Sequence, residues 1–220
     1  ETRSSTTGDA RGGSVTPLAV ALGDPAGVGP EVVAKAWESR VERRLLPFFA
    51  VGDQRSIEAV WHGPVERIST PAEAARCFGF ALPLIQVDDP GEILLGQPNL
   101  AGARCALDAL ELAVGLTNAG AACALVTAPV SKVQLYAIGF THAGQTEFVA
   151  ERCGIAAGNV VMMLVGPTLR TVPVTTHIPL TCVRERLNVD LIVSRSRVTA
   201  RGLARDFDIV DPRLAIAGLN

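Results

Sequence analysis

Residues 18–30 read LAVALGDPAGVGP, and this stretch decides the fold class more clearly than any other. The continuous apolar run LAVAL is typical of a buried strand. The three glycines that follow permit backbone angles that other residues rarely adopt, so a tight turn is expected. Pro30 suits the first position of a helix, and Glu31 is favourable at the positive end of one. The pattern therefore predicts a strand, a glycine-rich turn and a helix over about residues 30–40.

The same alternation of apolar runs and helical patterns continues outward from this stretch. Further strands are expected at residues 46–51, 84–87, 123–127, 160–165, 170–175 and 214–218, with a turn at residues 166–168. Further helices are expected at residues 56–61, 71–80, 102–119, 179–187 and 190–206. Strands that alternate with helices predict an α/β fold with a largely parallel sheet.

The domain organisation is predicted from changes in composition along the chain. Residues 1–17 are polar and rich in Ser, Thr and Gly, without the apolar stretch of a signal peptide, and are expected to form a flexible tail. A soft boundary falls at residues 127–132, where a strand gives way to a new loop. We therefore expect a first α/β domain over residues 18–127 and part of a second over residues 128–220.

Composition argues against several classes of protein. Hydrophobic residues make up 48% of the chain, and its formal net charge is −2, so nothing favours nucleic acid or an anionic membrane as a partner. No run approaches the roughly 20 apolar residues that span a bilayer, and a cytoplasmic location is expected. The five cysteines form no CxxC pair and no Gly-x-Ser-x-Gly occurs, which disfavours a zinc ribbon and a serine hydrolase.

Two loops that follow predicted strands each have a structural and a functional interpretation. The glycine-rich turn at residues 23–29 resembles an anion-binding loop, but it matches neither GxGxxG nor the Walker sequence, and a structural turn is preferred. Residues 127–132 read TAPVSK. Lys132 there is a candidate catalytic residue that could bind an anion or transfer a proton if desolvated. The alternative is a solvated surface lysine.

The polar segment THAGQTE at residues 141–147 lies between hydrophobic stretches. Its hydroxyl, amide and imidazole groups can all bond oxyanions, and Gly144 resembles a turn that enters a helix. Gln145 and Thr146 are therefore candidate substrate-binding residues. An ordinary helix cap, with Thr146 or Thr141 as the capping group, is the equal alternative.

His177 lies in TTHIPL, at the end of a predicted strand and before a predicted helix. A histidine in this place is suited to ligate a metal in a cleft. The chain offers no HxH or HExxH partner, however, and a lone histidine is more often a satisfied polar residue than a ligand. His177 is thus a candidate metal ligand that cannot form a site alone.

Taken in series, these motifs resemble the 4-hydroxythreonine 4-phosphate dehydrogenase family. The matching segments are GDPAGVGPE (23–31), TAPVSK (127–132), HAGQTEF (142–148), VMML (161–164), LRTVPVTTHIPL (169–180) and AGLN (217–220). The resemblance implies the α/β/α two-domain fold of isocitrate and isopropylmalate dehydrogenases, incomplete here, and a homodimer. It also implies oxidation of a phosphorylated substrate by NAD or NADP with a divalent metal (Zn, Mg or Co), followed by decarboxylation, in pyridoxal phosphate synthesis.

The resemblance also assigns roles to individual residues. His177 matches the first metal-binding histidine of the family. Gln145 and Thr146 match a His-Thr pair that contacts the substrate phosphate, with glutamine replacing histidine. After GLN the family continues with a second metal-binding histidine, so the chain is expected to be C-terminally truncated and inactive by itself. Two alternatives stay open: a dehydrogenase for another phosphorylated or dicarboxylate diol, and an inactive module that binds a phosphorylated ligand.

Overall fold

The structure is a computed structural model of the 220-residue chain, and it describes residues 15–176 and 178–218. The chain divides into two compact units, Glu1–Phe140 and Thr141–Asn220. The boundary expected from the sequence near residue 127 stays a prediction. In the part of the chain that the structure describes, no helix is both long and apolar enough to cross a membrane.

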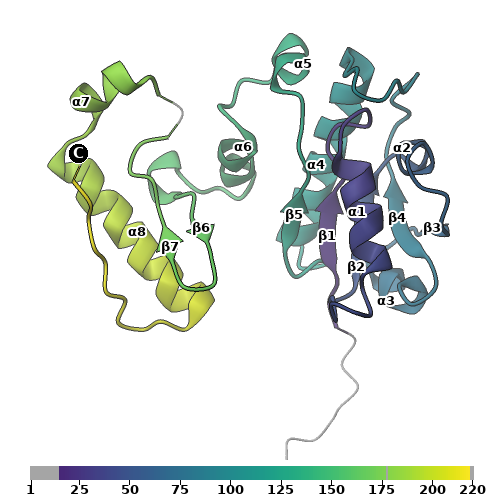
Figure 1. The fold of residues 1–220 in the computed structure, drawn as a ribbon, viewed down its shortest axis with the longest axis horizontal. Helices are drawn as coiled ribbons and strands as arrows, with labels where there is room; N and C mark the ends of the chain where they lie inside the picture. Colours follow the sequence, from purple (N-terminus) through teal and green to yellow (C-terminus); the bar gives the residue numbers. More distant parts are fainter. Residues whose placement is uncertain (1–14, 177, 219–220) are drawn as a thin grey trace, which may run out of the picture. The chain divides into compact units, whose positions relative to one another are not determined.

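A five-stranded sheet forms the centre of the first unit, in the order β3-β4-β2-β1-β5 (Figure 1). Its strands are β1 (Leu18–Ala21), β2 (Phe48–Gly52), β3 (Val65–Arg67), β4 (Leu82–Gln86) and β5 (Leu125–Thr127). Every neighbouring pair is parallel. Parallel sheets need helices on both faces because their connections cross over the sheet. The predicted α/β class is therefore confirmed.

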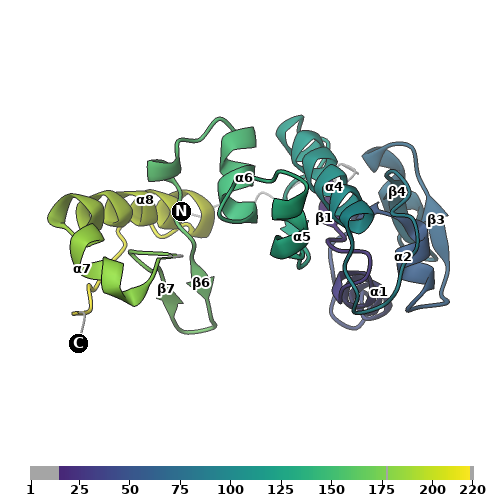
Figure 2. The same cartoon turned by 90° about the horizontal axis from the view of Figure 1, so that it is seen from above.

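Helices α1 (Gly29–Glu38) and α4 (Leu100–Asn118) lie on opposite faces of this sheet (Figure 2). The side chain of Asn99 caps α4 by accepting a hydrogen bond from the backbone N–H of Gly102 at 2.7 Å, which satisfies one of the donors that a helix start leaves unpaired. The remaining helical segments of the unit are α2 (Gln54–Glu58), the 3₁₀ turn η1 (Pro71–Glu73), α3 (Ala74–Cys77) and α5 (Lys132–Ala137).

The core of the first unit follows from the period-two alternation of its strands. Val20 and Leu22 lie in one buried cluster with Val33 and Trp37 of α1, because alternate side chains of a strand point to the same face. Burying each such side chain stabilises the fold by about 1.5–3 kcal/mol. The indole N–H of Trp37 donates to the backbone carbonyl of Phe78 at 2.9 Å, so its polar group is also satisfied. On the other face α4 packs against β1 and β2.

The second unit is built from helices and one small hairpin. Its elements are α6 (Gln145–Arg152), the 3₁₀ turn η2 (Ala157–Asn159), β6 (Leu164–Val165), β7 (Arg170–Thr171), the 3₁₀ turn η3 (Leu180–Cys182), α7 (Val183–Arg186) and α8 (Val189–Phe207). Strands β6 and β7 pair antiparallel, which confirms the predicted hairpin although both strands are shorter than expected. Asn188 caps α8 by accepting from the backbone N–H of Leu191 at 2.9 Å.

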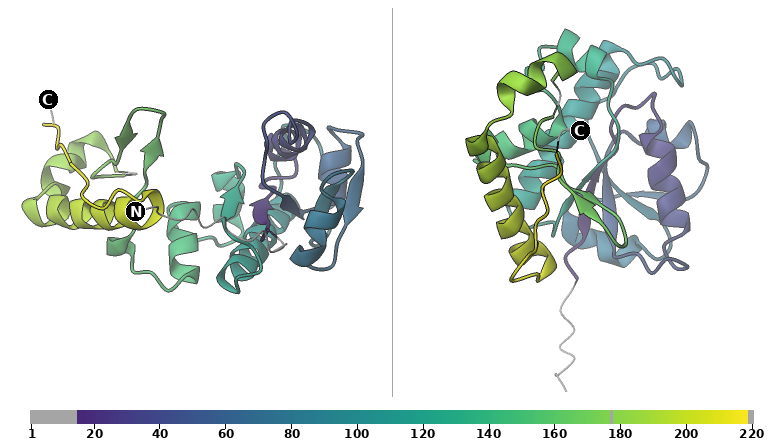
Figure 3. Two further views of the ribbon diagram at one scale, coloured as in Figure 1. Left: turned by 90° about the horizontal axis from the view of Figure 1, so that it is seen from below. Right: turned by 60° about the vertical axis from the view of Figure 1, so that its left-hand side comes forward.

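The strand expected at residues 214–218 is wrong. These residues form no strand pairing among residues 15–176 and 178–218. An apolar run becomes a strand only where a neighbouring strand accepts and donates its backbone hydrogen bonds. Residues 212–217 instead run beside α8 (Figure 3). Together with residues of α8 and of the β6–β7 hairpin they line a hollow.

Candidate functional site

The glycine-rich turn after β1 and the TAPVSK loop after β5 lie against each other. Ala21 and Thr127, at the carboxyl ends of these two strands, are partners in the parallel register. Beyond them, the N–H of Ala128 donates to the carbonyl of Ala21 at 3.0 Å, and the N–H of Asp24 donates to the carbonyl of Pro129 at 3.0 Å. The two motifs therefore form one hydrogen-bonded layer at the edge where parallel sheets bind ligands.

Two glycines of this turn are required by the close approach of backbone to backbone. Gly23 has φ +71°, and a Cβ there would lie 2.3 Å from the carbonyl oxygen of Pro129. A Cβ at Gly29 would lie 2.0 Å from the carbonyl oxygen of Leu22. The carboxylate of Asp24 accepts from the N–H of Ala26 at 2.9 Å, within the turn itself. These contacts give the turn a structural role.

A polar cluster that the sequence did not single out closes the ends of β2 and β4. The amide nitrogen of Gln86 donates to the Asp53 carboxylate at 2.8 Å, and the Gln86 amide oxygen accepts from the N–H of Gln54 at 3.0 Å. Arg55 lies 3.6 Å from the other carboxylate oxygen of Asp53. Each of these residues lies at or just beyond the end of an apolar strand, a position that could have identified them. Their bonds link the two strand ends, which favours a structural role.

Lys132, the candidate catalytic residue, is the first residue of α5 and its side chain is exposed. Gln145 and Thr146 belong to the second unit. The catalytic role expected for Lys132 and the substrate-binding roles expected for Gln145 and Thr146 stay predictions.

Gln145 and Thr146 are the first two residues of α6. The helix is capped by Gly144, with no hydrogen bond from a capping side chain. The alternative interpretation, in which Thr146 or Thr141 caps the helix, is therefore wrong, because α6 begins one residue before Thr146. A helix start that no side chain caps is favourable for an anion, since backbone N–H groups and the helix dipole both point there.

His142 is tied to the same helix. Its Nε2 lies 2.7 Å from a carboxylate oxygen of Glu151, and its ring packs edge-on against Phe148 at 5.3 Å between centroids. The hydrogen bond with His142 holds the pKa of Glu151 below its ordinary value. These contacts fix the loop before α6 to the body of the helix. His142 thus acts as a scaffold for Gln145 and Thr146.

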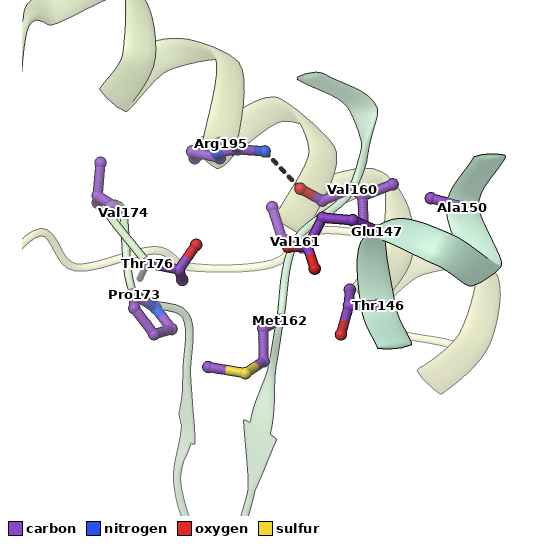
Figure 4. Close-up of a pocket in the computed structure, with 10 residues that line it drawn as sticks. All are labelled: Thr146, Glu147, Ala150, Val160, Val161, Met162, Pro173, Val174, Thr176 and Arg195. Atoms are coloured by element: carbon purple, nitrogen blue, oxygen red, sulfur yellow. Dashed lines mark hydrogen bonds between the residues drawn. The ribbon is translucent and has the colours of Figure 1, made fainter. Parts of the chain in front are cut away.

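A cavity of about 130 Å³ lies wholly within the second unit. Its wall is formed by Thr146, Glu147 and Ala150 of α6, by Val160, Val161 and Met162 before β6, by Pro173, Val174 and Thr176 after β7, and by Arg195 of α8 (Figure 4). The cavity contains the predicted substrate contact Thr146, and Thr176 precedes the predicted metal ligand His177. His177 itself lies outside the described residues. Gln145 is not part of the cavity wall.

Charges of both signs line this cavity, and the sequence reasoning missed both of them. Arg195 donates from a guanidinium nitrogen to the backbone carbonyl of Val160. Glu147 has a buried carboxylate oxygen, Oε2, without a hydrogen-bond partner in the described part of the chain. A buried carboxylate oxygen is unfavourable unless a donor reaches it. The cavity can therefore accept a hydrogen-bond donor at Glu147 and a negative group at Arg195.

The described residues offer few donors for a metal ion. Residues 15–176 and 178–218 contain no group of three or more His, Cys, Asp or Glu side chains placed to hold a metal ion. The cavity offers one carboxylate, Glu147, and two hydroxyls, Thr146 and Thr176. Catalytic zinc sites need three protein ligands rich in nitrogen, sulfur or carboxylate donors. The described residues therefore do not fit a divalent metal by themselves.

Comparison with known proteins gives a consistent set of relatives. The family model described as pyridoxal phosphate biosynthetic protein PdxA matches residues 45–220. The 4-hydroxythreonine-4-phosphate dehydrogenase of Zymomonas mobilis is 56% identical over 204 residues, and that of Erythrobacter litoralis is 47% identical over 209 residues. Each alignment covers 93% of this chain, which spans 61% and 62% of the two relatives' lengths.

A solved structure is similar over the same region. The 4-hydroxythreonine-4-phosphate dehydrogenase of Klebsiella pneumoniae superposes with a TM-score of 0.79 at 28% sequence identity. The superposition covers 93% of this chain and 64% of that structure. The predicted family resemblance and its α/β fold are confirmed by these matches.

Proposed function

The chain belongs to the PdxA family of pyridoxal phosphate biosynthetic proteins, and from this premise we propose that it serves the NAD(P)-dependent oxidation of 4-hydroxythreonine 4-phosphate. The proposed reaction transfers a hydride from the secondary alcohol carbon to the nicotinamide, and the resulting β-keto acid then loses carbon dioxide. The observation that carries the proposal is the cavity at the start of α6, which Thr146 and Arg195 both line. A cytoplasmic homodimer belongs to the same proposal.

The chain's own residues would bind and orient the substrate. Thr146 and the start of α6 supply neutral donors for the phosphate, and Arg195 adds the positive charge that a phosphate prefers. Gln145 can donate a hydrogen bond but cannot carry charge, whereas the family has histidine at this position. In this proposal Arg195 supplies the positive charge that Gln145 lacks.

His177 is proposed as a ligand of a divalent metal, which would act as a Lewis acid on the alcohol oxygen. The proposal rests on the family motif alone, because the described residues supply no metal-binding group. Metal content is its direct measurement. His177→Ala in the intact gene product should abolish bound zinc, magnesium or cobalt while the circular dichroism spectrum is retained. Unchanged metal content in the variant would remove His177 from the site.

Binding of 4-hydroxythreonine 4-phosphate to the 220-residue chain tests the substrate site. Calorimetry should detect binding to the wild type, and Thr146→Val should weaken it by about 10- to 100-fold, the value of one hydrogen bond to a charged group. Thr168→Val, in the hairpin turn outside the cavity, is the matched control and should bind like the wild type. Equal affinities of all three proteins would reject the cavity as the phosphate site.

A second candidate function is supported by the glutamine at position 145. A neutral side chain where the family has histidine favours a dehydrogenase for another phosphorylated or dicarboxylate diol, or a module that binds a phosphorylated ligand without turnover. Gln145→His distinguishes these cases. If position 145 contacts phosphate, the added imidazole should make the Michaelis constant of the intact gene product depend on pH near about 6.5. A flat pH profile would remove position 145 from the phosphate site.

A further inference from the structure

We propose that Glu147 is a specificity-determining residue that receives the ammonium group of an amino-acid substrate. The inference rests on the proposed function and deepens it, because 4-hydroxythreonine 4-phosphate carries an ammonium group on the carbon next to its carboxylate. The family resemblance assigned roles to the two residues before Glu147 but none to Glu147 itself. The assignment comes from the burial and surroundings of its carboxylate.

The hydrogen bonding of the Glu147 carboxylate is incomplete among the described residues. Its Oε2 atom is buried and has no hydrogen-bond partner among the residues that the structure describes. Removing a carboxylate oxygen from water without a compensating bond is strongly unfavourable. Most buried polar atoms in folded proteins have a hydrogen-bond partner, so the Oε2 of Glu147, unpartnered among the described residues, indicates that a donor from another molecule binds there. A bound ligand with N–H groups would supply that donor.

Glu147 is one of the residues that line the cavity. Glu147 and Thr146 enter the cavity from α6, whereas Arg195 enters from α8 and is bonded to the carbonyl of Val160 (Figure 4). A molecule in the cavity therefore meets a negative and a positive group on different walls. The volume of about 130 Å³ accommodates several water molecules or a small charged group, but not a nucleotide.

An ammonium group is the donor that best fits this carboxylate. An ammonium group carries N–H donors and a positive charge, so its bond to a carboxylate is charge-assisted and stronger than that of a hydroxyl. Glu147 is one carboxylate among the lining residues of the cavity, and a single carboxylate is enough to bind an ammonium group, whereas a catalytic zinc takes three protein ligands. An amino acid phosphate has an ammonium for Glu147 and anionic groups for Arg195. Its 2-hydroxy analogue has only the anionic groups.

The experiment compares two ligands that differ at this one group. Isothermal titration calorimetry on the intact gene product would use 4-hydroxythreonine 4-phosphate and the analogue in which a hydroxyl replaces the 2-amino group. Glu147→Gln keeps the shape of the side chain and removes its charge. Glu185→Gln, at an exposed carboxylate of α7 outside the cavity, removes the same charge and serves as the control.

The wild type and the Glu185→Gln control should prefer the amino compound by about 10- to 100-fold, the value of a charge-assisted hydrogen bond. Glu147→Gln should lose this preference while binding the analogue within about 2-fold of the wild type. A wild type that binds both compounds equally would overturn the proposal, without reference to how any variant folds. An unchanged preference in a folded Glu147→Gln protein would overturn it as well. A folded wild type that binds neither compound would overturn the proposed function together with this inference.

Discussion

Replacing Gly23 with alanine should strongly destabilise the first unit. At φ +71° an alanine is strained by about 1–2 kcal/mol, because its Cβ crowds the following carbonyl. The new Cβ would also lie 2.3 Å from the carbonyl oxygen of Pro129, so the loop after β5 must shift. Displacing well-packed atoms costs about 1–3 kcal/mol. The expected loss is about 2–5 kcal/mol, a large share of the roughly 5–15 kcal/mol that keeps a typical domain folded.

Gly120→Ala is the matched control for this substitution. Gly120 has φ +73°, almost the same as Gly23, but apart from its chain neighbours no atom of residues 15–176 and 178–218 lies within 4 Å of the position its Cβ would occupy. Both changes reduce the entropy of the unfolded chain equally, so that effect cancels in the comparison. The difference between the two variants therefore measures the contact between the turn after β1 and the loop after β5. It should be about 1–3 kcal/mol.

Urea denaturation followed by tryptophan fluorescence is suited to this measurement. The chain has 2 tryptophans, Trp37 and Trp61, and both lie in the first unit, so the signal reports that unit alone. The urea midpoint should fall further for Gly23→Ala than for Gly120→Ala, with a similar slope for each protein. If the two variants lose the same stability, the backbone contact with Pro129 does not hold the two motifs together.

Two further predictions concern titrating groups of the first unit and the cysteines. Burial raises the pKa of Cys105 to about 12, so its thiol should resist alkylation by iodoacetamide at about pH 8. The exposed Cys123 and Cys153 should be alkylated under the same conditions. Mass spectra of the native protein that show equal labelling of all three cysteines would contradict this prediction. Hydrogen bonds from the hydroxyl and N–H of Thr70 lower the pKa of Glu73 in the folded state. The Glu73 carboxylate therefore stabilises the fold at pH values above its unfolded pKa of about 4.5. This stabilisation is lost as the pH falls through the lower pKa of the folded state. Thr70→Ala should move the Glu73 titration midpoint in NMR spectra upward, and an unmoved midpoint would show that the capping bonds do not form.

The sequence predicted those elements of the fold whose signals are local. The strand and helix around residues 18–38 were found because an apolar run, a glycine turn and a helix start follow one another directly. Strand β3 was missed because it reads VER and lies at the edge of the sheet, where two of its side chains are exposed. The strand expected at residues 214–218 failed for the converse reason: its apolar pattern is present, but no described strand pairs with it.

In the candidate site too, the residue with a local sequence signal was predicted and the residues without one were missed. Thr146 could be predicted because it belongs to a short motif that opens a helix. Glu147 is its neighbour, but its burial depends on the segments around β6 and β7, which no local pattern reveals. Arg195 reads as one of several arginines of an amphipathic helix until α8 is folded against Val160. The sequence alone could therefore not predict that Glu147 and Arg195 line the same cavity, because tertiary packing brings them there.

The central claim is that this chain serves the oxidation of 4-hydroxythreonine 4-phosphate, and nicotinamide reduction is its most direct measurement. The intact gene product, supplied with this substrate, a divalent metal and NAD or NADP, should reduce the nicotinamide and release carbon dioxide. Thr146→Val should lower kcat/KM by about 10- to 100-fold, because it removes one donor to the phosphate. A folded, metal-supplied protein that reduces neither NAD nor NADP with this substrate would contradict the claim.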